Sequence, residues 1–190
     1  YNIEKVYVEL RKLFVLRKHF LKNPIATLQN RIVEITKYIL YDKMSVEEGA
    51  SWTVSGATIT FTNNVSVAGT LAFNGGENIT FLKDLVFSGA GKCIPASSKF
   101  IFAGEGDQLL DFNDTSVCNL SFEKISGNVS FGANGFTAGR MYCAATVPID
   151  FTFAAGELYS ITNLQLSGIV SSVSSLKLKS SVPGTPWRLS

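Results

Sequence analysis

The sequence predicts a mainly β chain: a parallel β-helix, or solenoid, of about 20 residues per coil, preceded by an N-terminal pair of α-helices. Three observations predict this fold class. Apolar residues recur at helical spacing before residue 44 but not after it, and the later chain consists of short alternating segments between Gly, Asn and Asp. One apolar pattern also returns about every 20 residues. The 190 residues are 46% hydrophobic and 17% charged, which favours a folded protein over a disordered one.

Residues 1–44 are predicted to form helices near 2–22 and 24–43, as a docking or oligomerisation module. Apolar residues of the second helix lie three or four positions apart, on one face, and Asn23-Pro24 supplies a cap residue and a first-turn proline. The first helix adds a basic face. We expect the module to contact partner subunits through an apolar row and three basic residues: Ile25, Leu28, Ile32, Ile35, Ile39, Arg11, Arg17 and Lys18.

Three interpretations of this module remain open: a hairpin that caps the next domain, a short coiled-coil stalk, or a basic helix on a membrane surface. No apolar run approaches the roughly 20 residues that span a bilayer, so membrane insertion is not expected. The net charge of +2 gives the whole chain no field of the kind that attracts nucleic acid.

Residues 45–50 are predicted to be a linker and residues 51–190 to form the solenoid. Its strands should be short, because turn-forming residues interrupt the alternating pattern every few positions. The expected strands are residues 58–62, 70–73, 79–81, 85–87, 99–102, 120–122, 129–131, 149–153, 164–166 and 176–178.

One apolar column is predicted to run along the solenoid, with steps of 20, 21, 20, 21 and 20 residues through Phe61, Phe81, Phe102, Phe122, Cys143 and Asn163. An apolar residue stands two positions before each of them, Ile161 before Asn163 being the last. Parallel strands of successive coils stack like positions on one another, so Phe61, Phe81, Phe102, Phe122 and Cys143 should form a buried ladder. A second column is expected through Phe73, Cys93, Phe112, Phe131 and Phe151.

These repeats resemble those of pectin-lyase-like right-handed parallel β-helices. The stretch LKLKSSVPGTPWRLS, residues 176–190, is similar to a coil of large bacterial surface proteins and phage-associated fibres. In that coil a Leu-rich strand is followed by Ser-Ser-x-Pro-Gly-Thr and a Trp strand. The resemblance covers roughly residues 51–190 and implies that further coils follow Ser190 or that a partner caps the solenoid.

The carboxylates Glu105, Asp107, Asp111 and Asp114 are the best local candidates for a metal or catalytic site. The resembling family includes enzymes with clustered carboxylates on outward strands. However, the spacing fits no calcium loop and two leucines interrupt the run, so a solvated turn is the preferred interpretation. Arg140 is expected to form a surface ion pair, with Asp150 or Glu123 one coil away.

No metal, cofactor or catalytic residue is predicted. The single His19 and the three cysteines show no zinc-ligand spacing. Cys93 and Cys143 occupy apolar positions of the two columns and are expected to be buried, unreactive thiols.

The sequence therefore favours a structural or binding protein: a β-helical fibre or appendage segment located extracellularly, on a virion or on a cell surface. A virion tail fibre, spike or capsid decoration and a bacterial surface adhesin all fit. Expected partners are further copies in a homo-oligomer or other subunits of a particle or surface assembly, and a cell-surface glycan is a further candidate.

Two alternatives remain. One is a carbohydrate-active enzyme, a polysaccharide lyase or hydrolase, with its site on outward strands near residues 107–114 and Arg140. The other is an ice- or surface-binding solenoid, which needs a regular threonine face. The outward row keeps that regularity for only two coils, in Thr60, Thr80, Ile101 and Ser121.

Overall fold

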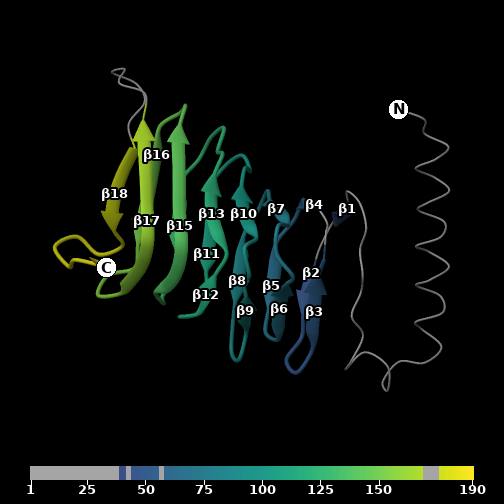
Figure 1. The fold of residues 1–190 in the computed structure, drawn as a ribbon. Coiled ribbons are helices and arrows are strands. Elements are labelled where there is room, and N and C mark those ends of the chain that lie inside the picture. Colours follow the sequence, from purple (N-terminus) through teal and green to yellow (C-terminus); the bar gives the residue numbers. More distant parts are fainter. Residues whose placement is uncertain (1–38, 42–43, 56–57, 169–175) are drawn as a thin grey trace, which may run out of the picture. The chain divides into compact units, whose positions relative to one another are not determined.

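The computed structural model describes residues 39–41, 44–55, 58–168 and 176–190. They form a parallel β-solenoid of about 6 turns, with about 21 residues per turn, as the repeat predicts. Figure 1 shows strands of successive coils lying side by side. None of these residues belongs to a helix that could cross a membrane. The predicted helix 2–22 and most of the predicted helix 24–43 lie outside the described residues.

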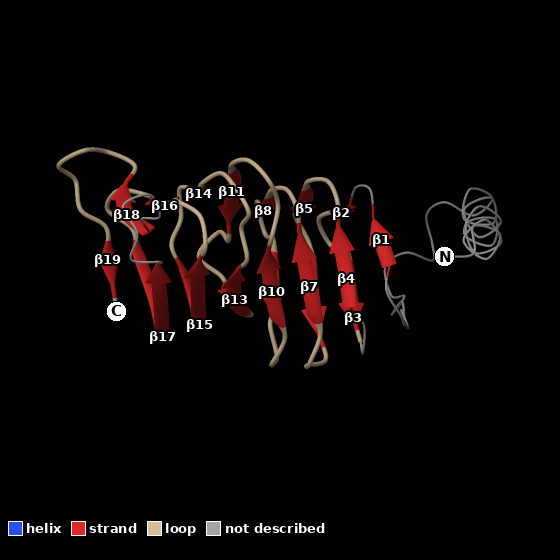
Figure 2. Cartoon of the chain, turned by 90° about the horizontal axis from the view of Figure 1, so that it is seen from above, coloured by secondary structure: helices blue, strands red, loops and turns tan. Residues whose placement is uncertain are grey.

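The strands form three sheets whose neighbours are parallel. The nine-stranded sheet contains β1 (Ile39–Tyr41), β4 (Thr58–Phe61), β7 (Asn78–Phe81), β10 (Lys99–Phe102), β13 (Asn119–Phe122), β15 (Phe136–Ala145), β17 (Leu158–Gly168) and β19 (Arg188–Leu189), with β12 (Ser116–Val117) beside β15. Figure 2 shows members of this sheet in that order.

The two other sheets complete the coils. The seven-stranded sheet contains β18 (Leu176–Ser180), β16 (Ile149–Phe153), β14 (Val129–Phe131), β11 (Gln108–Asp111), β8 (Leu85–Phe87), β5 (Val65–Val67) and β2 (Met44–Val46). The three-stranded sheet contains β3 (Ser51–Val54), β6 (Thr70–Phe73) and β9 (Lys92–Ile94).

The register of the nine-stranded sheet explains the repeat in the sequence. Each position pairs with the same position of the next coil, so that Ile59 lies opposite Ile79 and Phe61 opposite Phe81. Ile39, Ile59, Ile79, Phe100, Leu120, Met141 and Leu164 follow one another at steps of 20, 20, 21, 20, 21 and 23 residues.

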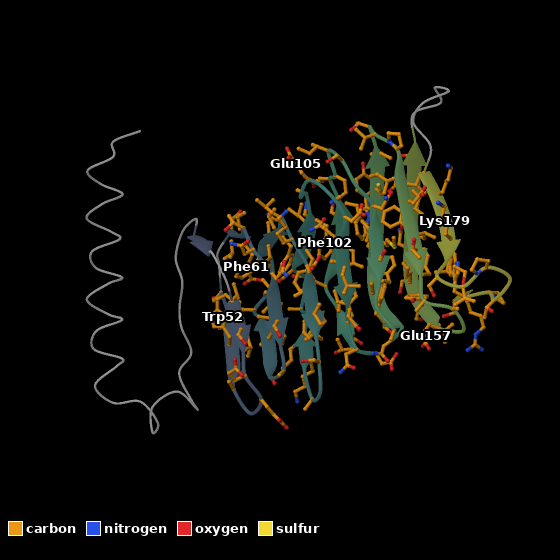
Figure 3. All side chains as sticks on the ribbon, turned by 180° about the vertical axis from the view of Figure 1, so that it is seen from behind. Trp52, Phe61, Phe102, Glu105, Glu157 and Lys179 are labelled. Atoms are coloured by element: carbon orange, nitrogen blue, oxygen red, sulfur yellow. The ribbon has the colours of Figure 1, made fainter. Side chains whose placement is uncertain are left out.

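The core contains a stack of four phenylalanine rings, one from each of four successive coils. Ring centroids are 5.3 Å apart between Phe61 and Phe81, 5.4 Å between Phe81 and Phe102, and 5.3 Å between Phe102 and Phe122. All four rings are buried, and Cys143 continues the column opposite Phe122. Figure 3 shows Phe61 and Phe102 within this part of the molecule. The strands thus bury one face by stacking coil on coil, because no coil could cover its own apolar side chains.

Two segments near the start of the solenoid differ from the prediction. Residues 39–41 form strand β1, paired with β4, where a helix was expected to reach residue 43. Residues 44–46 form strand β2, paired with β5, where the linker was expected to begin at residue 45. Pairing with the next coil satisfies the backbone groups of these short apolar segments, which outweighs the helical spacing of their side chains.

Two parts of the predicted columns are also wrong. Asn163 lies opposite Arg140, and Leu166 lies opposite Cys143 instead. Three extra residues between β15 and β17 shift this step from 20 to 23.

The second column, Phe73 to Phe151, joins residues of different sheets. Leu71, not Phe73, lies opposite Cys93 in the three-stranded sheet. In the seven-stranded sheet Phe131 lies opposite Leu110, and Phe151 lies opposite Val129.

Candidate functional site

Most of the predicted partner-binding residues lie outside the described residues: Arg11, Arg17, Lys18, Ile25, Leu28, Ile32 and Ile35. Ile39 is described, and it lies in strand β1, opposite Ile59. The prediction that Ile39 belongs to a helical docking face is therefore wrong.

Of the carboxylates of residues 105–114, only Asp111 lies in strand β11; Glu105 and Asp107 precede the strand and Asp114 follows it. Asp107 precedes this strand and Asp111 ends it, so their backbones are about 13 Å apart at the usual rise of a strand. Pairs of carboxylates that cleave glycosides lie about 5–9.5 Å apart. Glu105 lies on the preceding loop, at the rim seen in Figure 3. Among the described residues no group of three or more acidic, His or Cys side chains could hold a metal ion.

Asp107 belongs to a row of side chains that connect consecutive coils. At this corner of the solenoid an Asn or Asp oxygen accepts a hydrogen bond from a backbone N–H one coil further on. We call this row the corner ladder. Its bonds are Asp84 N to Asn64 Oδ1 (3.4 Å), Leu109 N to Asp84 Oδ1 (2.8 Å), Asn128 N to Asp107 Oδ1 (2.8 Å) and Asp150 N to Asn128 Oδ1 (3.1 Å).

Replacing Asp107 by alanine is expected to lower the free energy of unfolding by about 1–2 kcal/mol, because the Asn128 N–H loses its acceptor. Asp107→Asn should have a smaller effect, since an amide oxygen can accept the same bond. Urea denaturation of both variants measures the difference. Equal stability of the alanine variant and wild type would show that the corner ladder contributes nothing.

A buried amine lies next to this corner. Lys124 is 3% exposed, and its Nζ donates hydrogen bonds to Gly106 O (2.7 Å) and Gln108 Oε1 (2.9 Å). The Gln108 amide in turn donates to Phe81 O (3.2 Å) and Lys83 O (2.9 Å). This amine network therefore joins three successive coils through neutral acceptors.

Burial lowers the pKa of Lys124 to about 8. Loss of hydration is the largest cause, Lys83 adds to it, and the carboxylates of Asp107 and Asp84 oppose it. The sequence prediction missed this residue, although a signal was present. Leu120, Phe122 and Lys124 alternate as inward residues of one strand do, which places the lysine on the core side.

The three cysteines are free and buried, as predicted for Cys93 and Cys143. A side-chain hydrogen bond with Cys93 raises the pKa of Cys118, and burial adds to the effect. The Cys118 Sγ donates a hydrogen bond to Pro95 O (3.2 Å). Burial raises the pKa of Cys143 to about 11. Thiolate formation at Cys118 and Cys143 is therefore disfavoured at neutral pH.

The outer surface of the nine-stranded sheet carries a polar cluster on β15 and β17, which we call the outward patch: Arg140, Tyr142, Asn163 and Gln165. The guanidinium carbon of Arg140 lies 5.1 Å from the centroid of the Tyr142 ring, and its Nη2 donates to Gln165 Oε1 (2.8 Å). Asn163 lies opposite Arg140, and Gln165 lies opposite Tyr142. The guanidinium of Arg140 thus lies over an aromatic ring, next to exposed amides.

The predicted ion pair of Arg140 does not form among the described residues. Asp150 pairs with Lys179, and Glu123 accepts a hydrogen bond from Ser121 Oγ (3.2 Å). Tyr142 and Gln165 were missed because their pairing depends on the 23-residue step. Tyr142 and Gln165 continue the outward row after Thr60, Thr80, Ile101 and Ser121.

Comparison with protein-family models, with curated proteins and with solved structures gave no match for this chain. The solenoid fold is shown by the structure, whereas a relation to pectin-lyase-like or phage proteins remains a prediction from the sequence.

Proposed function

We propose that the chain is a structural or binding protein: a β-helical segment of an extracellular fibre, spike or surface appendage, of viral or bacterial origin. The observation that supports this function is the continuous core of stacked coils, with its four-ring phenylalanine ladder. Such a core makes a stiff rod whose outer faces keep a fixed spacing over many residues. A compatible role is to hold a recognition surface away from its point of attachment.

The outward patch is the surface that we propose for recognition, with a cell-surface glycan as its ligand. It offers one aromatic ring, one fixed positive charge and two amides on a rigid sheet, the combination of apolar area and a few oriented polar groups that small ligands need. Because the strands hold these groups before a ligand arrives, little ordering would oppose binding. Attachment to other subunits is assigned to the N-terminal segment, through the apolar row at Ile25, Leu28, Ile32 and Ile35.

Binding of the full chain to a panel of neutral and acidic polysaccharides tests this function. Arg140→Ala combined with Tyr142→Ala should weaken binding at least about tenfold, since arginine and tyrosine are typical of dominant contacts. Thr80→Ala, on the same outward row but three coils away from β15, is the matched control and should bind like wild type.

Two results would count against the proposal. If the double variant bound the polysaccharide as tightly as wild type, the outward patch would not be the recognition surface. The second result is cleavage of an acidic polysaccharide during the incubation. If changing Asp107, Asp111 and Asp114 to asparagine abolished this cleavage, the protein would be a lyase or hydrolase and not a binding protein.

A further inference from the structure

Backbone pairing between coils is interrupted where the three-stranded sheet ends. Strand β9 pairs with β6 of the preceding coil, whereas β12 of the following coil pairs with β15. Figure 1 shows β9 and β12 side by side, although no register of paired residues joins them within the described chain. Pro95, which follows β9, has no backbone N–H to continue the ladder. This step of the solenoid therefore depends on side chains.

Two cysteines lie at this interruption. The Cys93 N–H donates to Thr115 Oγ1 (3.4 Å). The Cys118 Sγ donates to Pro95 O (3.2 Å), so that contacts between the same two segments lie close to both cysteines. A side-chain hydrogen bond joins the two thiols directly. Cys93 is 7% exposed and Cys118 is 1% exposed, so both side chains meet in the interior of the solenoid.

The separation of neighbouring coils is compatible with a covalent bond between these thiols. Neighbouring strands lie about 4.8 Å apart, and the Cα atoms of disulfide-bonded cysteines are about 4.4–6.8 Å apart. Thiols that already share a hydrogen bond need little movement to form such a bond. Cys143 has no such neighbour, because Phe122 and Leu166 lie opposite it in the adjacent coils.

We propose that Cys93 and Cys118 form a disulfide that ties two coils together where their backbones are not paired. The proposal rests on the extracellular location proposed above, because disulfides form and persist in oxidising surroundings. The oxidant is a small disulfide such as oxidised glutathione. The Cys93 thiolate attacks it and releases one glutathione, and the Cys118 thiolate then attacks the Cys93 sulfur and releases the second. One small disulfide is thereby reduced to two thiols, which take up the two protons that the cysteines lose.

The bond forms during folding, before the core closes around the two cysteines. In the folded chain both side chains are buried and the pKa of Cys118 is raised, so thiol–disulfide exchange there is slow. The same burial protects the bond from reductants once it has formed. We therefore expect the oxidised chain to keep its bond in a thiol-containing buffer until the chain unfolds.

Refolding of the denatured full chain in a mixture of oxidised and reduced glutathione tests the proposal, with refolding in excess reductant as the reference. After oxidative refolding, one of the three cysteines should still react with an alkylating reagent in denaturant. The mass should be lower by two hydrogen atoms, and proteolysis without reduction should release a peptide pair that links residues 93 and 118. The thermal midpoint should be higher by roughly 5–10 °C than that of the reduced chain, as expected for a bond that closes a loop of this length.

Variants of the chain identify the bonded pair. Cys143→Ala is the matched control and should form the bond as wild type does. Cys93→Ala and Cys118→Ala should each keep two free thiols and unfold at the same temperature in both buffers. Each variant is compared with itself in the two buffers, so the effect of the substitution on packing cancels. If a variant does not fold, the linked peptide pair from the wild-type chain decides the test alone.

Four outcomes would overturn the proposal: three free thiols after oxidative refolding, a bond that includes Cys143, a lasting glutathione adduct on Cys93 that Cys118 does not displace, or a bond between Cys93 and Cys118 that lowers the thermal midpoint. The last result would show that the coils must distort to form the bond. These measurements follow thiols and unfolding, whereas the polysaccharide panel follows binding through Arg140 and Tyr142. The two proposals can therefore fail separately.

Discussion

Replacing Phe102 by alanine is expected to lower the free energy of unfolding by about 3–5 kcal/mol. The ring of Phe102 is fully buried and stacks on Phe81 at 5.4 Å and on Phe122 at 5.3 Å, so its removal leaves a cavity between two coils. The walls of this cavity are strands that are paired on both sides, which limits their ability to collapse into it. The loss should therefore lie near the upper end of the usual range for a core phenylalanine.

Equilibrium denaturation measures this loss, and two further variants locate its cause. Phe102→Leu should lose much less, because it keeps most of the buried volume. Ile101→Ala changes the neighbouring outward residue and should also lose less, since that side chain is only half-buried. Each coil is supported by its neighbours, so we expect one cooperative transition with a lower midpoint rather than local melting. An unchanged midpoint for Phe102→Ala would contradict the stacking of coils.

The strands of the nine-stranded sheet could be predicted from the sequence because the pairing of these strands sets the spacing of similar residues along the chain. Parallel pairing in register puts Phe61, Phe81, Phe102 and Phe122 at a separation equal to the coil length. Coil length is nearly constant over these four coils, so the ladder could be predicted without any knowledge of the turns.

The seven-stranded sheet could not be predicted in the same way. Its register depends on the length of the loops at the corners, and the step from Leu85 to Leu110 is 25 residues where that from Val65 to Leu85 is 20. Part of the difference lies in the loop before β11, residues 103–107, which is longer than the loop before β8, residues 82–84. Nothing in the composition of the longer loop fixes how many residues it uses. For that reason the predicted column mixed Cys93 of one sheet with Phe112, which follows a strand of another.

The candidate sites were predictable only in part. Arg140 was identified as an outward residue, but its two contacts were not predicted. Tyr142 lies two positions further along the same strand, and Gln165 lies in the next coil. The acidic residues near β11 were the best local candidates for a metal or catalytic site, but Asp107 accepts a hydrogen bond from a backbone N–H of the next coil. Spacing along the chain cannot show which backbone group will lie opposite a side chain one coil away.

The buried amine of Lys124 should make stability depend on pH in the alkaline range. Its pKa is lowered to about 8 in the folded chain, from 10.5. Below pH 8 both the folded and the unfolded chain hold the proton, and the folded chain then carries the unfavourable burial of a charged amine. Between pH 8 and 10.5 the folded chain has released the proton while the unfolded chain still binds it, so stability rises with pH. The contribution of Lys124 should grow by about 3 kcal/mol over this interval.

Comparison with Lys124→Met isolates this contribution, because other groups act in the opposite direction. The pKa of Tyr159 is raised to about 12 by burial, so ionisation of this residue in the unfolded chain removes stability as the pH rises through about 10. Cys118 and Cys143, whose pKa values are also raised, likewise lower the stability as the pH rises, because their thiols ionise more readily in the unfolded chain. Methionine leaves Gly106 O and Gln108 Oε1 without a donor, which is a loss independent of pH. The difference in unfolding free energy between wild type and Lys124→Met should therefore shift in favour of wild type from pH 8 to 10.5. A difference that stays constant over this range would mean that the amine is hydrated in the folded chain and that the amine network is open to water.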